Sequence, residues 1–125
     1  MKDKATKGFN RVLLVNPETG SKLGGIRPHS GLGYLEKYLT GRGIECRVFD
    51  MRLGHSYGEL LGAAREMDAD LIGFSLYSFG YKRSYALIEK TKQDLSGVAV
   101  VAGGPHISSF LTDALRGCPA IDYGV

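Results

Sequence analysis

The sequence predicts an α/β fold in which helices wind around both faces of a parallel five-stranded sheet. Short apolar runs alternate strictly with segments of helical periodicity along the 125 residues. Such alternation is typical of right-handed crossovers between parallel strands. The 18 glycines, about twice the average usage, suit the many close turns of such a fold. Five strand-forming runs match a doubly wound, flavodoxin-like sheet with the strand order 2-1-3-4-5.

The first half of the chain is expected to contain two strands and two helices. Residues 11–16 form a β-branched apolar run that Pro17 ends, and a long glycine-containing loop follows. Leucines at helical spacing predict a helix over about residues 30–41. Residues 44–50 are expected to form the second strand, and apolar positions recurring over 57–67 predict an amphipathic helix.

The second half continues the same alternation. Residues 70–75 are a third apolar run, and aromatic and aliphatic residues stripe a helix over 81–95. Residues 98–102 predict the fourth strand, 107–115 a short fourth helix and 121–125 the fifth strand. No internal repeat interrupts this order.

Composition and charge limit the classes of function. With 43% hydrophobic and 23% charged residues, the chain has the composition of one globular domain. The net charge of +3 owes much to three lysines at the start of the chain. We therefore expect a flexible tail over residues 1–9, a balanced domain over 10–125 and no nucleic-acid partner. No apolar run is long enough to span a membrane. The two cysteines, Cys46 and Cys118, suit a reducing cytoplasm, and Cys46 is expected to be buried.

Ligands of such sheets bind at the carboxyl ends of the strands. The segments of interest therefore follow Asn16, Ser75 and Ala102. Paired glycines, Gly103-Gly104, would remove side chains where a bulky ligand presses on the backbone. Ser75, with Tyr77 beside it, would supply hydroxyl groups on the neighbouring loop.

Several common ligand motifs are missing. The dinucleotide-binding fingerprint is absent after the first strand, as is a phosphate-binding P-loop. A phosphoryl-accepting aspartate at the end of the third strand is replaced by Ser75. Asp50 would either hold a ribose or cap a turn. A small nucleotide or flavin site over Thr19, Gly20 and Ser21 is a further alternative.

Three segments, taken in order, carry a family resemblance. They are residues 27–35 (RPHSGLGYL), 69–75 (ADLIGFS) and 100–106 (VVAGGPH). Together they resemble the N-terminal cobalamin-binding domain of cobalamin-dependent radical S-adenosylmethionine enzymes, including methyltransferases and anaerobic magnesium-protoporphyrin monomethyl ester cyclases. The resemblance implies a corrin ring across the carboxyl edge and a nucleotide tail beside the strands. The cofactor-binding residues that we infer on this basis are Pro17, His29, Ser75, Tyr77, Gly103, Gly104 and His106.

Cobalt ligation is where the chain departs from a related pattern. Cobalamin domains whose histidine binds cobalt carry Asp-x-His-x-x-Gly, in which the aspartate orients the imidazole. Here His29 fits the histidine position, but Arg27 and Leu32 replace the aspartate and glycine. His29 is thus the candidate metal ligand, although the resemblance favours a site in which no histidine binds cobalt.

The resemblance also implies a longer parent enzyme. Cys46 and Cys118 cannot supply the Cys-x-x-x-Cys-x-x-Cys motif that holds a [4Fe-4S] cluster. The cluster and S-adenosylmethionine would therefore bind to a radical domain elsewhere in the parent chain, and the present residues would catalyse nothing alone. The alternative is a domain of the same fold that binds no cofactor and serves for docking or for shaping a substrate site.

Overall fold

A computed structural model describes residues 8–17 and 30–125. Its five strands are all parallel and have the order β2-β1-β3-β4-β5, which confirms the predicted fold. The strands are β1 (Arg11–Asn16), β2 (Glu45–Asp50), β3 (Leu71–Ser75), β4 (Ala99–Gly103) and β5 (Tyr123–Gly124). The α-helices are α1 (Ser30–Gly41), α2 (Tyr57–Glu66), α3 (Tyr81–Asp94) and α4 (Pro105–Gly117).

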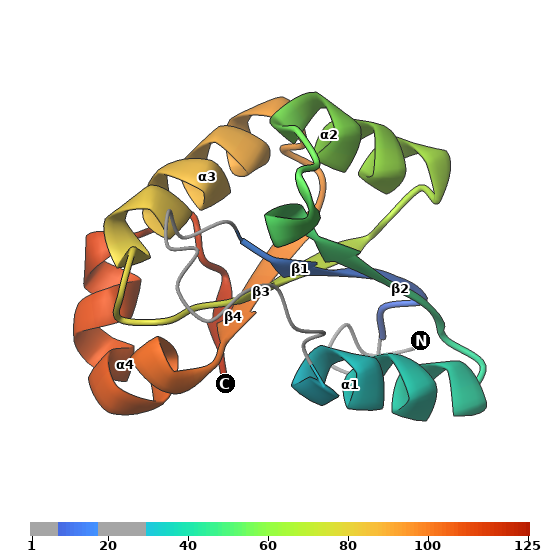
Figure 1. Cartoon of the computed structure of the whole chain (residues 1–125), viewed down its shortest axis with the longest axis horizontal. Helices are drawn as coiled ribbons and strands as arrows, with labels where there is room; N and C mark the ends of the chain where they lie inside the picture. Colours follow the sequence, from blue (N-terminus) through green and yellow to red (C-terminus); the bar gives the residue numbers. More distant parts are fainter. Residues whose placement is uncertain (1–7, 18–29) are drawn as a thin grey trace, which may run out of the picture.

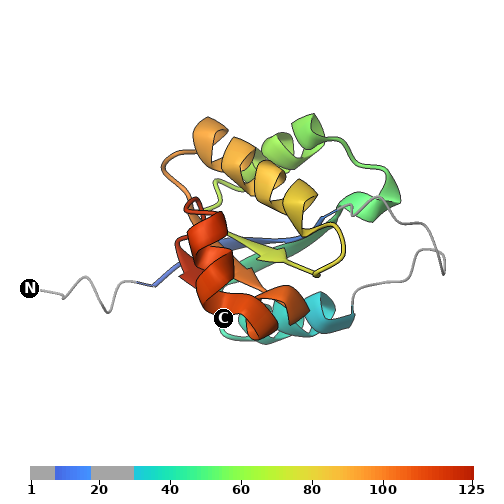
Figure 2. The same cartoon turned by 90° about the vertical axis from the view of Figure 1, so that its left-hand side faces the viewer.

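The helices divide unequally between the two faces of the sheet. In Figure 1, α2 and α3 lie above the sheet, α1 lies below it, and α4 lies beside α3 at the left; Figure 2 shows the same layers from the side. The larger core joins alternate strand residues such as Val15 and Phe74 to α2, α3 and α4. The smaller core joins Val12 and Leu14 to Leu32 of α1. Side chains of a strand alternate between faces, so each strand contributes to both layers.

The face that carries α1 is only partly covered by the described residues. The smaller core lies over β1 and β2, where α1 packs. At β5 the same face leaves Tyr123 53% exposed and Val125 78% exposed. Among residues 8–17 and 30–125, the α1 face is therefore exposed at β5, whereas Ser75 of β3 is buried.

Two short segments differ from the sequence-based expectation. Helix α4 begins at Pro105, two residues earlier than predicted, because proline is well suited to a first helical position. Phe110 interrupts its helical backbone angles, and the helix continues to Gly117. A short 3-10 helix, η2 (Met51–Leu53), was not predicted, and Asp50 caps it by accepting a hydrogen bond from the Arg52 backbone N–H. Asp50 is thus a cap, one of its two expected roles.

Carboxylates fasten the strands at their amino ends. Asp70, just before β3, accepts hydrogen bonds from the backbone N–H groups of Asn10 (2.9 Å) and Arg11 (3.0 Å). Asp122, just before β5, accepts one from the Val100 N–H at 2.8 Å and another from Lys92. These contacts tie β1 to β3 and β4 to β5 at the edge opposite the predicted site. Within the described residues, no helix is both long and apolar enough to cross a membrane.

Candidate functional site

Three residues lie in one row where the central strands end. Ser75 of β3 is in register with Gly103 of β4. Val15 of β1 is in register with Phe74, so Asn16 and Ser75 are the next residues along their strands. Because Leu14 and Leu71 belong to the α1-face core, alternation places Asn16 and Ser75 on that face too. We call Asn16, Ser75 and Gly103 the carboxyl-edge row.

The turn after β4 presses directly against the end of β3. The Leu76 N–H donates to the Gly103 carbonyl at 2.8 Å, and the His106 N–H donates to the Leu76 carbonyl at 3.1 Å. Between them, Gly104 has φ +100° and ψ −178°, a conformation almost restricted to glycine. A Cβ on Gly104 would lie 2.7 Å from the Leu76 carbonyl oxygen and 3.2 Å from the Ser75 Oγ. Gly104 is therefore needed by the backbone itself.

Gly103 is a glycine for a different reason. Its φ is not in the left-handed range, and a Cβ there would meet only Val125, at 3.0 Å from Cγ2 and 3.8 Å from the carbonyl oxygen. The nearer atom is the end of a side chain that is 78% exposed. Because Gly103 has no side chain, there is free space above the carboxyl-edge row next to the exposed Val125. A ligand could occupy that space.

A polar network fills the other end of the row. Asn16 is 1% exposed, and its Nδ2 donates to the Asp50 Oδ1 at 3.2 Å. Arg52 also donates to the Asp50 carboxylate, from Nε at 3.3 Å and from its terminal nitrogen at 3.2 Å. The Asn16 Oδ1 is buried and has no hydrogen-bond partner in the part of the chain that the structure describes. The sequence predicted a site in the segment after Asn16, but not at Asn16 itself. The feature that could have identified Asn16 is a polar residue at the end of an apolar strand.

His106 does not join this row. Its imidazole lies between α3 and α4, where Nε2 is 2.8 Å from the Tyr85 hydroxyl and Nδ1 is 3.2 Å from the Ser78 hydroxyl. The ring stacks on Tyr81 with centroids 4.8 Å apart. A surface cavity of about 420 Å³ opens beside this cluster, between α3 and α4. The first turn of α4 thus carries His106 toward the α3 side, while Gly103 and Ser75 face the α1 side.

The remaining predicted site residues lie either next to β1 and β3 or outside the described residues. Pro17 is buried directly after β1, and Tyr77 is half-buried in the loop after β3. His29, the candidate cobalt ligand, lies outside the described residues, as do Thr19, Gly20 and Ser21. Over residues 8–17 and 30–125, no group of three or more histidine, cysteine, aspartate or glutamate side chains is arranged to hold a metal ion.

Burial of the His106 imidazole should make the stability of the folded protein depend on pH near neutrality. Burial lowers the pKa of His106 from its ordinary value of 6.5, so the unfolded chain binds a proton more readily than the folded one. The contribution of neutral His106 to the free energy of unfolding is therefore fully present above about pH 6.5. It is lost as the pH falls toward the lower pKa that His106 has in the folded protein. We expect the thermal midpoint to decrease between about pH 7.5 and 5.5, as measured by circular dichroism.

A variant of the buried histidine separates this effect from general acid sensitivity. His106→Gln should flatten the pH profile relative to wild type. An equal slope in wild type and His106→Gln would contradict the assignment.

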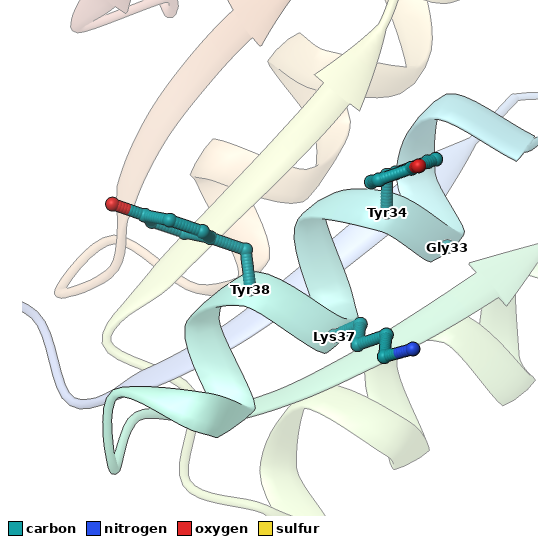
Figure 3. Close-up of a pocket in the computed structure, with 4 residues that line it drawn as sticks. All are labelled: Gly33, Tyr34, Lys37 and Tyr38. Carbon is teal, nitrogen blue, oxygen red and sulfur yellow. The ribbon is translucent and has the colours of Figure 1, made fainter.

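A second hollow, of about 580 Å³, lies on α1. Gly33, Tyr34, Lys37 and Tyr38 line it, and Figure 3 shows both tyrosine rings standing out from the helix. Tyr34 is 80% exposed, whereas Leu32 points into the smaller core. The hollow therefore opens on the outer side of α1, away from the carboxyl-edge row.

Both cysteines are chemically quiet. Cys46 is buried in β2, as predicted, and Cys118 is fully buried after α4. Burial raises the pKa of each thiol to about 11. Neutral thiols are poor nucleophiles and poor metal ligands, so neither residue belongs to a reactive site.

The B12 binding domain family matches this chain over residues 19–125. That range includes the whole carboxyl-edge row except Asn16. The chain belongs to the B12-binding domain family. Cobalamin is accordingly the cofactor of this domain, as the sequence resemblance implied.

Known proteins similar to the B12-binding domain are larger. A relative, an uncharacterized methyltransferase of Pyrococcus horikoshii, is 26% identical over 117 residues, covering 90% of this chain and 25% of that protein. The radical S-adenosylmethionine methyltransferase TsrM of Kitasatospora setae, solved with cobalamin and a [4Fe-4S] cluster bound, is 23% identical with a TM-score of 0.76 over 93% of this chain and 23% of that one. OxsB, a cobalamin-dependent S-adenosylmethionine radical enzyme, is 17% identical with a TM-score of 0.78 over 90% of this chain and 16% of that one.

These similarities agree on one type of domain. The two solved structures establish the fold of the B12-binding domain, and the chain spans about a quarter or less of the length of all three proteins. The domain resembles that of cobalamin-dependent radical S-adenosylmethionine enzymes, which confirms the resemblance inferred from residues 27–35, 69–75 and 100–106.

Proposed function

We propose that residues 10–125 bind cobalamin with the corrin ring across the carboxyl edge and the nucleotide tail along the open α1 face. One observation carries this placement: Gly103 leaves a side-chain-free position beside Ser75, on the part of the sheet that α1 does not cover. A deep tail needs such a small-residue wall together with polar partners. The residues present fit the group.

Each residue of the site has a distinct task in this proposal. Ser75 offers a hydroxyl to the tail, and Gly103 gives the tail room. Gly104 contributes indirectly, because its conformation holds the turn against Leu76 and Ser75. Pro17, Tyr77 and His29 flank the same edge in sequence and are proposed as further contacts. His106 acts from the α3 side, where it holds the Ser78 loop and α4 together.

The larger proposal concerns a parent enzyme. Cobalamin supplies a cobalt centre that exchanges methyl groups or electrons, and the protein supplies binding and orientation. We propose that this domain serves a radical S-adenosylmethionine methyltransferase or oxidative cyclase in the cytoplasm. A radical domain of the same chain would hold the [4Fe-4S] cluster and S-adenosylmethionine.

The test is retention of cobalamin by the 125-residue chain. After incubation with hydroxocobalamin and gel filtration, the protein fraction should keep the corrinoid absorption bands, shifted from those of free ligand. A shift in the cobalt bands of wild type that disappears in His29→Ala would assign His29 to cobalt. An unchanged His29→Ala spectrum would favour a site without a histidine ligand.

Colourless protein would contradict binding by this chain alone. The same experiment on the full-length parent then distinguishes two cases: cobalamin retained by the parent would mean that another domain completes the pocket. A colourless parent would favour the docking or substrate-shaping alternative.

A further inference from the structure

The side-chain oxygen of Asn16, Oδ1, is a buried polar atom whose hydrogen bonding is incomplete within the described residues. The residue is 1% exposed, and its Oδ1 has no hydrogen-bond partner among residues 8–17 and 30–125. Buried polar groups in native proteins nearly always have partners. An exception at the carboxyl end of a central strand, in the same row as Ser75 and Gly103, calls for a donor that comes from outside the described residues.

The direction of the Asn16 amide is fixed by its neighbours. Asp50 accepts from the Arg52 backbone N–H at 3.0 Å, from its Nε at 3.3 Å and from its terminal nitrogen at 3.2 Å. The Asp50 carboxylate, which pairs with Arg52, offers only hydrogen-bond acceptors to its neighbours. Asn16 must therefore present its NH2 group to Asp50, and its carbonyl oxygen must point the other way. A flipped amide would place two acceptors against each other.

We propose that the Asn16 Oδ1 accepts a hydrogen bond from a carboxamide N–H of cobalamin, and that Asp50 is the positioning residue that holds the amide for it. This inference rests on the proposed function and assigns a contact within it. The ring of a corrinoid carries several primary carboxamides, which are hydrogen-bond donors of the required kind. The row places Asn16 one strand away from Ser75, at the edge where the ring is proposed to lie.

The decisive variant is Asn16→Leu, which keeps the branching and the number of heavy atoms of the side chain and removes its polar atoms. In spectral titrations with hydroxocobalamin, its dissociation constant should be about tenfold higher than that of wild type, the usual effect of losing one hydrogen bond. The thermal midpoint of the ligand-free protein should change little, since the variant removes an unsatisfied buried oxygen together with the hydrogen bond that Asn16 donates to Asp50. Asn10→Leu, at the exposed start of the same strand region, is the matched control and should bind normally.

Asp50→Asn tests the positioning role. The substitution releases the constraint on the Asn16 amide, so the affinity for hydroxocobalamin should fall several-fold when Asn16 is present. In the double variant with Asn16→Leu, the affinity should be no lower than in Asn16→Leu alone. Additive losses would mean that Asp50 supports the fold independently, and would overturn its assignment.

A second probe identifies the donor. Dicyanocobinamide keeps the ring carboxamides and lacks the ribose, phosphate and base of the tail. Asn16→Leu should weaken binding of both corrinoids by a similar factor. A loss confined to hydroxocobalamin would place the donor on the tail and overturn the carboxamide assignment. Wild-type affinity in Asn16→Leu would overturn this inference alone, whereas wild-type protein that retains no corrinoid overturns the proposed function with it.

Discussion

Gly103→Val is expected to lose cobalamin while the protein remains folded. A Cβ at Gly103 would lie 3.0 Å from the exposed Cγ2 of Val125 and 3.8 Å from the Val125 carbonyl oxygen, so the fold accommodates it, and valine is favoured in strands. The new side chain would occupy the row beside Ser75, on the open α1 face. Overpacking a tight site costs about 1–3 kcal/mol, or roughly ten- to a hundredfold in affinity. Gel filtration after incubation with hydroxocobalamin measures the loss, and a thermal melt checks the fold.

Gly33→Ala is the control for replacing a glycine. A Cβ at Gly33 lies in open space on the outer side of α1, so the variant should bind cobalamin normally. It should also gain up to about 1 kcal/mol of stability, because alanine is the better helix former. Full retention of cobalamin by Gly103→Val would remove Gly103 from the proposed tail wall.

Gly104→Ala is expected to lose both stability and binding. Alanine at φ +100° and ψ −178° is strained, and its Cβ would lie 2.7 Å from the Leu76 carbonyl oxygen and 3.0 Å from the Leu76 nitrogen. Neither backbone atom can move without disturbing the end of β3. We expect the free energy of unfolding to fall by about 3 kcal/mol, and the thermal midpoint by roughly 10–15 °C.

The contrast between adjacent glycines makes the result interpretable. Chemical denaturation of both variants should show that the Gly104→Ala loss of binding accompanies a lower stability, whereas the Gly103→Val loss does not. If Gly104→Ala matched wild type in stability, the turn would have room to relax, and the close approach of Gly104 to Leu76 would not constrain it.

The sequence was sufficient for the architecture because that depends on local pattern. Apolar runs and helical spacing predicted all five strands and four of the helices to within a few residues at each end. Helix α4 was underestimated, since Pro105 starts it directly after the glycine turn. The short helix η2 follows from a cap, Asp50, whose role depends on its side-chain contacts.

The site was harder, because it depends on contacts between strands. Gly103 and Gly104 stood out together in sequence, yet only the approach of Leu76 separates the glycine that the backbone needs from the glycine that a ligand would use. His106 is two residues further on, at the start of α4, and its ring lies on the α3 side. The role that we propose for Asn16 becomes evident only from the strand register, which places it beside Ser75 and Asp50.

The clamps formed by Asp70 lie far from this row. Arg11, whose N–H binds Asp70, is five residues from Asn16 along β1, about 16 Å at the rise of a strand. The residues that fix strand register and those of the proposed cofactor contacts are thus separate sets, which can change independently during evolution. A descendant of this domain can therefore drift at the cofactor edge until it binds nothing and still keep its architecture, so persistence of the fold in a distant relative is no evidence that the corrinoid persists with it.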